Sequence, residues 1–304
     1  MKKIINEEKI EGRIYQHNLV KKISQNQESK IFGKEYISGN LEIAVDELGT
    51  NIIPVRFTCV LPENSNGSKN ITYSNLEKII NENKTWINNG KDEAIKVRLT
   101  KTALDVNDFY TQDGRLVSSK INRGGFVNIV NELNPESERN TFLEDMLITS
   151  VTRIDAEPEY MTVRGAVFDY RNDLLPVDFV VRNAEGMDYF EDLNPTQSEP
   201  VFTKVWGKIN FDSQTVETKE ETAFGEEAVT TRDKKVKEWL ITGTQKVPYE
   251  FGAEGVLTFE EVKKAMQDRE LKLADTKKRA EDSKNEKTVK AAPEVSISRG
   301  TFNF

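Results

Sequence analysis

Lysines, arginines and aromatic residues lie at short spacing through the first third of the chain. Those expected to be accessible are Lys21, Lys22, Lys30, Phe32, Lys34, Tyr36, Arg56, Lys96, Arg98, Lys101, Phe109, Tyr110, Arg115, Lys120 and Arg123. Cationic side chains neutralise phosphates, and flat side chains stack on bases. The combination predicts a groove for a single-stranded nucleic acid. Each residue alone is typical of a solvated surface, so the prediction depends on their joint placement. Phe126 adjoins the set, although a core position suits it equally.

The chain has too few histidine and cysteine residues for most of the chemistry that depends on them. His17 is the only histidine and Cys59 the only cysteine. This excludes a disulfide framework within one chain and a multi-cysteine metal site, and it leaves no His-based triad. Cys59 lies in an apolar segment and is expected to be a buried structural thiol. No phosphate-binding Gly-x4-Gly-Lys-Ser/Thr loop occurs. We therefore expect no catalytic residue, metal ion or cofactor.

Charge divides the chain into three unequal parts. The net charge is −8 overall; it is +3 over residues 1–131, −11 over 132–199 and 0 over 200–304. An acidic total argues against nonspecific wrapping of nucleic acid by the whole surface. A basic groove is therefore expected in the first part.

Two segments repeat one pattern of strand, turn and strand. The first surrounds Gly39 and ends on Pro-Val-Arg-Phe at Phe57, and the second surrounds Gly165 and ends on Pro-Val-Asp-Phe at Phe179. Glycine inside a strand is typical of a tight bend or a close backbone contact. The repeat predicts two similar β-rich modules.

Alternation of apolar and polar residues indicates strands over most of both modules. In the first module the expected strands are 9–23, 36–45, 51–60, 94–102 and 125–131, with a helix at 72–86. In the second they are 147–155, 160–170, 174–182, 200–211, 214–222 and 228–244, with a helix at 184–193. Three strands, a helix and two strands is the order of the OB fold, a five-stranded Greek-key barrel. We expect a mostly β protein with two such barrels in tandem, over residues 1–145 and 146–250. Other β architectures are the alternative.

The C-terminal part differs in composition from both modules. Residues 251–290 are rich in charged residues and alanine, and the hydroxyl of Thr258 before two glutamates is typical of a helix start. Residues 291–304 are expected to form a flexible tail in which Phe302 and Phe304 dock on a partner. No apolar run approaches the ~20 residues that cross a bilayer. We expect a soluble, intracellular protein without a membrane partner.

The second module offers fewer contacts to a nucleic acid. Its candidates are Arg164, Tyr170, Arg171, Lys204 and Trp206. The acidic surroundings of residues 132–199 repel phosphate. The second module is therefore expected mainly to extend or assemble the scaffold, by binding protein such as a second subunit, or to bind the second half of a strand path only weakly. The oligomeric state is left open, as is whether this module contacts nucleic acid.

Four short motifs carry a family resemblance. They are Glu-Gly-Arg-Ile-Tyr at 11–15, Ser-Gly-Asn-Leu-Glu-Ile-Ala at 38–44, Val-Phe-Thr-Lys-Val-Trp-Gly at 201–207 and Thr-Phe-Asn-Phe at 301–304. With them the chain resembles phage-encoded single-stranded-DNA-binding proteins. The resemblance implies OB folds, coating of DNA during replication or recombination, a tail that binds replication or recombination proteins, and a place in the cytoplasm of the bacterial host. Bacterial single-strand binders end in an acidic tip that closes on Pro-Phe, and this tail departs from that pattern because its end, Arg-Gly-Thr-Phe-Asn-Phe, has no acidic residue.

These observations leave three hypotheses. The first is a non-enzymatic protein that coats single-stranded DNA in a phage replication system. The second is a phage structural or host-interaction protein that binds proteins through its β modules and aromatic tail. The third is an enzyme that acts on nucleic acid through scattered carboxylates.

Overall fold

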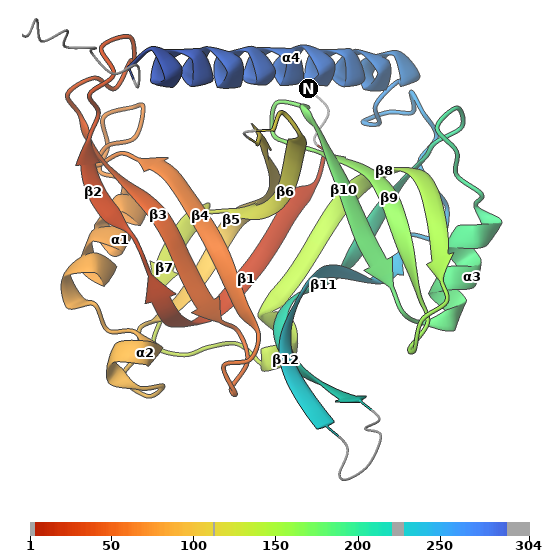
Figure 1. The fold of residues 1–304 in the computed structure, drawn as a ribbon, viewed down its shortest axis with the longest axis horizontal. Helices are drawn as coiled ribbons and strands as arrows, with labels where there is room; N and C mark the ends of the chain where they lie inside the picture. The colour runs from red at the N-terminus through yellow and green to blue at the C-terminus, as the bar shows by residue number, and fades with distance from the viewer. Residues whose placement is uncertain (1–3, 112, 221–227, 291–304) are drawn as a thin grey trace, which may run out of the picture.

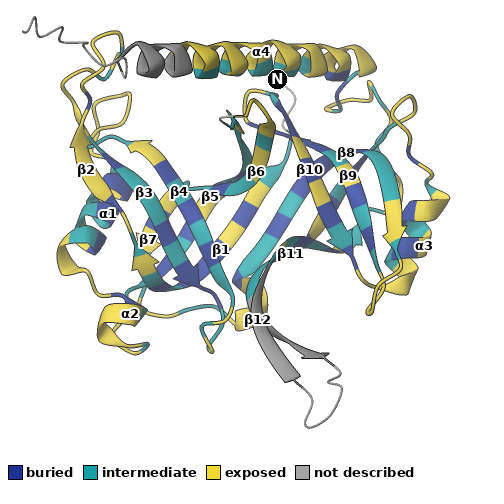
Figure 2. Ribbon diagram, in the orientation of Figure 1, coloured by how far each residue is buried: buried dark blue, intermediate teal, exposed yellow. Residues whose placement is uncertain are grey.

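The computed structural model describes residues 4–111, 113–220 and 228–290 of the chain. The protein is mostly β, and twelve strands join in one continuous sheet that curls into two barrels (Figure 1). A long C-terminal helix crosses both barrels along one side of the molecule. Buried residues line the inner faces of the barrel strands, whereas the helix is largely exposed (Figure 2).

The first barrel closes from five strands. These are β1 (Asn6–His17), β3 (Glu35–Ala44), β4 (Ile52–Val60), β5 (Lys96–Tyr110) and β6 (Leu116–Arg123). Antiparallel pairs join β3 to β1 and β4, β4 pairs with β6 in parallel, and β5 returns from β6 to β1. Helix α1 (Ile71–Glu82) lies between β4 and β5 in the chain. This is the strand and helix order of the OB fold.

Two short strands, a short helix and a single helical turn flank the strands of the first barrel. Strand β2 (Val20–Ile23) pairs with β3, and β7 (Phe126–Ile129) pairs with β5. The short helix α2 (Trp86–Asn89) follows α1, and a single turn, η1 (Glu136–Glu138), precedes the second barrel.

The second barrel repeats the same closure. Its strands are β8 (Asn140–Ile154), β9 (Tyr160–Phe168), β10 (Leu174–Val181), β11 (Val201–Glu220) and β12 (Ala228–Thr244). Again the third and fifth strands, β10 and β12, pair in parallel, and the fourth strand, β11, returns to the first. Helix α3 (Ala184–Asp192) lies between the third and fourth strands. The predicted fold class, two OB-like barrels in tandem, is confirmed.

The repeated glycines sit where each barrel's second strand bends. Gly39 has a φ of +139°, and a Cβ added there would lie 2.6 Å from the carbonyl oxygen of Asn18. A Cβ on Gly165 would lie 1.9 Å from the carbonyl oxygen of Leu147. Both positions therefore require a residue without a side chain.

The two barrels share a junction. Strand β1 pairs with β8 from Asn6↔Glu144 to Ile10↔Asn140, so the first strand of each barrel is a neighbour of the other. One core cluster contains Ile10 of the first barrel together with Phe142 and Trp239 of the second. Residues of both barrels can therefore line a common surface.

Helix α4 (Phe259–Lys290) begins at a capping box. The hydroxyl of Thr258 accepts a hydrogen bond from the Glu261 amide, and the Glu261 carboxylate accepts one from the Thr258 amide. Val262 is buried against the second barrel, and Arg269 contacts Asp108 of the first at 3.0 Å. The predicted charged helix is present and begins directly after Thr258, the predicted cap. None of the helices described is both long and apolar enough to cross a membrane. The expected tail, with Phe302 and Phe304, lies outside the described residues.

Three local expectations are wrong. Cys59 is exposed rather than buried, because the inward alternation of β4 ends at Phe57. The fifth strand of the first barrel is β6, not the segment 125–131, of which residues 126–129 form the edge strand β7. The expected strands 200–211 and 214–222 are one strand, β11, which pairs with β12 down to Glu220↔Ala228.

Candidate nucleic-acid interface

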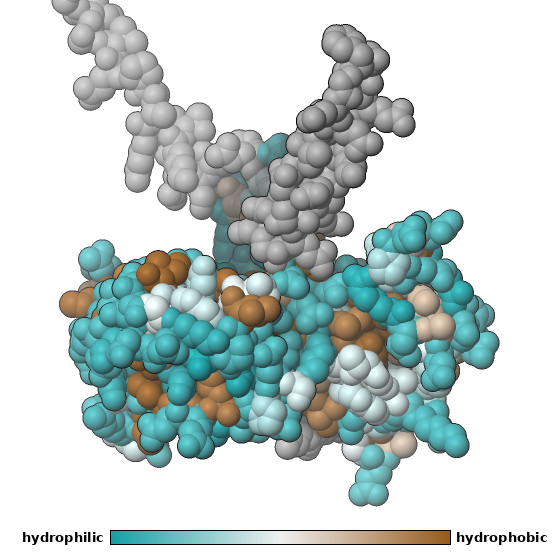
Figure 3. All heavy atoms as spheres, turned by 90° about the horizontal axis from the view of Figure 1, so that it is seen from below, coloured by the Kyte–Doolittle hydropathy of each residue, from teal (hydrophilic) through white to brown (hydrophobic). Residues whose placement is uncertain are grey.

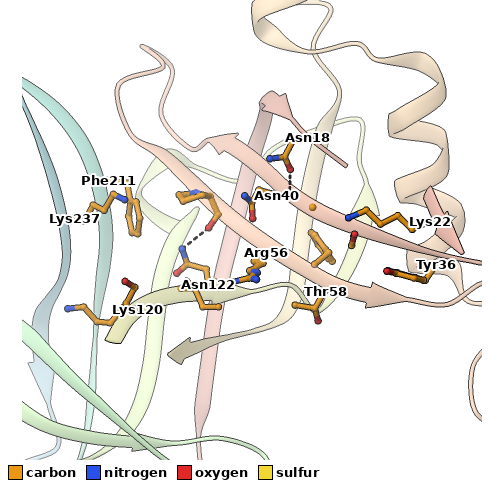
Figure 4. Close-up of a pocket in the computed structure, with 16 residues that line it drawn as sticks. Asn18, Lys22, Tyr36, Asn40, Arg56, Thr58, Lys120, Asn122, Phe211 and Lys237 are labelled. Atoms are coloured by element: carbon orange, nitrogen blue, oxygen red, sulfur yellow. Dashed lines mark hydrogen bonds between the residues drawn. The ribbon is translucent and has the colours of Figure 1, made fainter. Parts of the chain in front are cut away.

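A groove of about 640 Å³ lies between the two barrels. Strands β2, β3, β4 and β6 supply one wall, and β11 and β12 of the second barrel supply the other (Figure 4). We call it the inter-barrel groove. Four cationic residues line it, namely Lys22, Arg56, Lys120 and Lys237, and no acidic residue is among the described residues of its lining. In a chain with a net charge of −8, this is a local positive surface.

Strand alternation directs the first-barrel residues into the groove. On β4, Ile53, Val55 and Phe57 are buried in the core, so Arg56 projects to the opposite side. On β3, Ile37 is buried and its neighbour Tyr36 faces the groove in the same way. Successive side chains of a strand point to opposite faces, so the hydrophobic core fixes which polar residues line the groove.

The free cations stand at the two ends of the groove. Lys22 lies beside Tyr36 at one end, and Lys237 lies at the other with its ammonium 5.7 Å from the Phe211 ring centroid (Figure 4). Both lysines are exposed, and neither forms an ion pair with the described part of the chain. Each end therefore offers a cation and an aromatic ring together.

Lys120 and Arg56 also line the groove, and both have partners. The Lys120 ammonium contacts the Asp178 carboxylate at 2.6 Å and lies 4.8 Å from the Trp239 ring centroid, so it ties β6 to the second barrel. Burial would raise the pKa of Asp178, but the hydrogen bond and charge of Lys120 bring it below its ordinary value. Arg56 donates to the Asn107 side chain at 3.2 Å. A neutral partner leaves the charge of Arg56 uncompensated.

Four of the predicted contacts meet in this groove: Lys22, Tyr36, Arg56 and Lys120. Another group lies on the connections at the barrel ends. Lys30, Phe32 and Lys34 are exposed between β2 and β3, and Phe109, Tyr110 and Arg115 lie at the tip of the β5–β6 hairpin. These are the first–second and fourth–fifth connections, which OB folds use to bind oligonucleotides. Phe126 is 59% exposed and lies beside Cys59, away from the groove.

The remaining predicted contacts are engaged within the protein. Arg98 forms a two-pronged ion pair with Glu11, at 2.8 and 2.9 Å, and the Glu11 side chain is only 4% exposed. Lys21, Lys101 and Arg123 are paired with carboxylates. Lys96 donates to a backbone carbonyl, and Trp206 packs over Gly243 outside the groove. The ion pair of Arg98 with a buried carboxylate supports the fold.

Sequence reasoning missed the amides and the second-barrel residues of the groove. Asn18, Asn40 and Asn122 line it, and the alternation of β3 was a signal that could have identified Asn40. Asn122 donates to the Pro54 carbonyl at 2.9 Å, while its buried carbonyl oxygen has no hydrogen-bond partner in the described protein. Phe211 and Lys237 come from the other barrel, and no local pattern places them here.

The face of the molecule shown in Figure 3 is largely hydrophilic, with apolar side chains in separate small patches. Within the described ranges, no three His, Cys, Asp or Glu side chains are grouped so that they could hold a metal ion. The groove thus offers cations, amides and rings, a set that suits a polyanion carrying planar groups.

Comparisons with known proteins give one family. The family model described as YorF matches residues 6–279. No curated protein matches the chain. Two solved structures of the single-stranded DNA binding protein from Thermus aquaticus are similar in fold. A deletion mutant has a TM-score of 0.47 and 10% identity over 84% of this chain and 100% of that chain. The wild type has a TM-score of 0.44 and 11% identity over 83% and 98%.

Proposed function

We propose that this chain, which belongs to the YorF family, is a non-enzymatic protein that binds single-stranded DNA in the inter-barrel groove. One observation carries the proposal: four cations and no acidic residue line a groove whose ends hold Tyr36 and Phe211. Cations along a backbone and rings for the bases are the two requirements of single-strand binding. Bases in a duplex are already stacked on each other, so the rings favour an unpaired strand.

The biological setting is a further part of the proposal. We propose that the protein coats single-stranded DNA during the replication or recombination of a phage, in the cytoplasm of the bacterial host. The resemblance of the four sequence motifs supports this setting and the choice of DNA over RNA. Replication or recombination proteins are the partners proposed for the C-terminal tail.

Fluorescence anisotropy with labelled oligo-dT tests the binding. We expect the triple variant Lys22→Glu, Arg56→Glu, Lys237→Glu to lose most of its affinity. The slope of log K against log salt should fall by about 2, because each phosphate contact on a single strand contributes about 0.7. A hairpin duplex of the same sequence composition should bind more weakly than the single strand.

The control variant reverses the same amount of charge elsewhere. Lys69, Lys84 and Lys246 are exposed, lie outside the groove lining and form no ion pair within the described residues. Their combined change to Glu should alter affinity far less than the groove variant. Equal losses in the two triple variants would show that only net charge matters, and salt-independent binding by the unmodified protein would refute the proposed groove.

A further inference from the structure

A second hollow, of about 540 Å³, adjoins the inter-barrel groove. The start of β1 and the middle of β5 meet there with the end of β6 and with the turn between β9 and β10. Tyr170, in that turn, is 70% exposed. We call it the Tyr170 hollow, and, like the groove, it is lined by both barrels.

Two guanidinium groups lie close to the ring of Tyr170. The central carbons of Arg123, from the first barrel, and Arg171, from the second, are each 5.2 Å from its ring centroid. Cations at this distance are attracted to an aromatic face. Even with both arginines in place, Tyr170 remains largely exposed to solvent.

The turn that carries Tyr170 is held in place by its neighbours. One carboxylate oxygen of the buried Asp169 accepts hydrogen bonds from the amides of Arg171 and Asp173, at 2.8 and 2.9 Å. The Asp169 amide in turn donates to the Asp173 carbonyl at 3.0 Å. The exposed ring is therefore presented by a fixed loop, which lowers the entropy lost when a ligand stacks on it.

The hollow and the groove both reach the end of β6. Asn122 lines the groove, and the next residue, Arg123, lines the hollow. Arg123 is the register partner of Arg56 on β4, and the amide of Gly124 donates to the Arg56 carbonyl at 2.9 Å. Two guanidinium-bearing residues on adjacent strands thus connect the two depressions.

We propose that a single strand leaving the inter-barrel groove passes Arg56 and Arg123 and stacks one base on Tyr170. This inference rests on the proposed function. Lys101, at the rim of the hollow, is paired with Glu7 at 3.2 Å, and both side chains are about half exposed. Such exposed pairs contribute little to stability, so a phosphate can take the place of the carboxylate at small cost.

The second barrel then contributes a base contact although its surroundings are acidic. Stacking does not depend on net charge, and the cations nearest to the ring neutralise the local carboxylates. The acidic module extends the path of the strand by one stacking platform and does not form a second phosphate groove.

A length series of oligo-dT, from roughly 4 to 16 nucleotides, tests the path with Tyr170→Ala. Short oligomers that fill only the groove should bind the variant and the unmodified protein equally. Longer ones that reach the hollow should bind the variant roughly 5- to 150-fold more weakly. Tyr170→Phe, which keeps the ring, should restore the affinity. Tyr160→Ala is the matched control, because Tyr160 also lies under an arginine, Arg182 at 5.3 Å, but lines neither depression.

Cross-linking gives an independent measurement. Oligo-dT containing 5-iodouracil should cross-link to the peptide that contains Tyr170 only when the oligomer is long. Equal affinity of Tyr170→Ala and the unmodified protein at every length, or cross-links confined to the groove, would overturn the inference while leaving the proposed function intact. If the proposed function itself is wrong, the observation differs, because the unmodified protein will then bind no oligomer of any length.

Discussion

The indole nitrogen of Trp239 donates a hydrogen bond of 3.0 Å to the Glu8 carboxylate. Trp239 lies on β12 of the second barrel and Glu8 on β1 of the first, and both are almost fully buried. Register places Glu8 opposite Phe142 and Asn6 opposite Glu144, so the two glutamates project from the same face of adjacent strands. The other oxygen of Glu8 and both oxygens of Glu144 have no hydrogen-bond partner among the described residues.

Burial controls the protonation of this junction. It raises the pKa of Glu8 to about 8, against a smaller opposing effect of the Trp239 hydrogen bond. Burial also raises the pKa of Glu144 well above its ordinary value, and the nearby Glu8, Asp145 and Glu7 carboxylates act in the same direction. The junction between the barrels is therefore built from carboxyl groups that favour the neutral form.

The first prediction concerns the stability of the fold as a function of pH. The pKa of Glu8 is 4.5 in the unfolded chain and about 8 in the folded protein. The contribution of neutral Glu8 to the free energy of unfolding is therefore fully present below pH 4.5 and is lost as the pH rises to 8. Glu8→Gln stays neutral and can still accept from Trp239. Its free energy of unfolding, relative to the unmodified protein, should increase by about 1.4 kcal/mol per pH unit in this window. Urea unfolding at several pH values measures this.

The exposed Glu28 supplies the control for that series. Glu28→Gln should leave the pH dependence of unfolding unchanged. A Glu8→Gln variant whose stability parallels that of the unmodified protein from pH 5 to 8 would show that Glu8 is ionised in the folded state.

The second prediction compares two neighbouring buried acids. Glu144 has no hydrogen-bond partner in the described chain, whereas Asp145 accepts hydrogen bonds from the Ile5 amide at 2.8 Å and the Tyr249 hydroxyl at 3.0 Å. Glu144→Met removes an unsatisfied polar group at similar volume and should stabilise the protein by about 1–3 kcal/mol. Asp145→Ala leaves the amide and the hydroxyl unpaired and should destabilise it by about 1–3 kcal/mol. Thermal and urea unfolding at pH 7 should show opposite signs, and destabilisation by both changes would mean that Glu144 has a partner.

The third prediction separates structural cations from surface cations. Arg98→Ala removes the guanidinium from the buried Glu11 carboxylate, which keeps the Asn134 amide as a donor at 2.7 Å, and should cost about 1–3 kcal/mol of stability. Arg115→Ala breaks a pair with Asp113 in which both side chains are more than half exposed, and it should cost less than about 1 kcal/mol. Urea unfolding gives both values. Similar costs for the two variants would contradict the supporting role of Arg98.

The sequence predicted the barrels where the core imposes strict alternation. Alternate residues are buried at Leu41 and Ile43 of β3 and at Ile53, Val55 and Phe57 of β4. Gly39 allows the bend, so strand order and helix position could be inferred. Strand β6 was missed because only Asn122 is buried along Leu116–Arg123, and its polar residues face the groove instead of a core. Cys59 was misplaced because it continues an apolar run beyond the end of the buried face.

The candidate site was predictable only in part for the same reason. Lys22, Tyr36 and Arg56 lie on strands whose alternation is visible in the sequence. Phe211 and Lys237 enter the groove because β1 pairs with β8 and brings the barrels together. That contact joins segments more than 100 residues apart, and no local pattern encodes it.

The last prediction is a gain of DNA affinity, and it rests on the proposed function. Asp178 neutralises Lys120 at the groove, and its side chain is 60% exposed. Asp178→Asn removes this carboxylate and leaves the Lys120 ammonium uncompensated, so oligo-dT should bind more tightly at low salt. The slope of log K against log salt should steepen by about 0.7, the value of one additional phosphate contact. Stability should fall by less than about 1 kcal/mol, because the carboxylate is largely exposed.

The matched control is Asp188→Asn, which removes a carboxylate paired with Arg153 at 2.8 Å in the same barrel, outside the groove. Anisotropy titrations of both variants over a salt series measure the affinities and the salt slopes. An equal gain of affinity in the two variants would show that the gain comes from net charge alone. A loss of affinity in Asp178→Asn would mean that the carboxylate orients Lys120 for binding the strand and does not compete with the strand for Lys120.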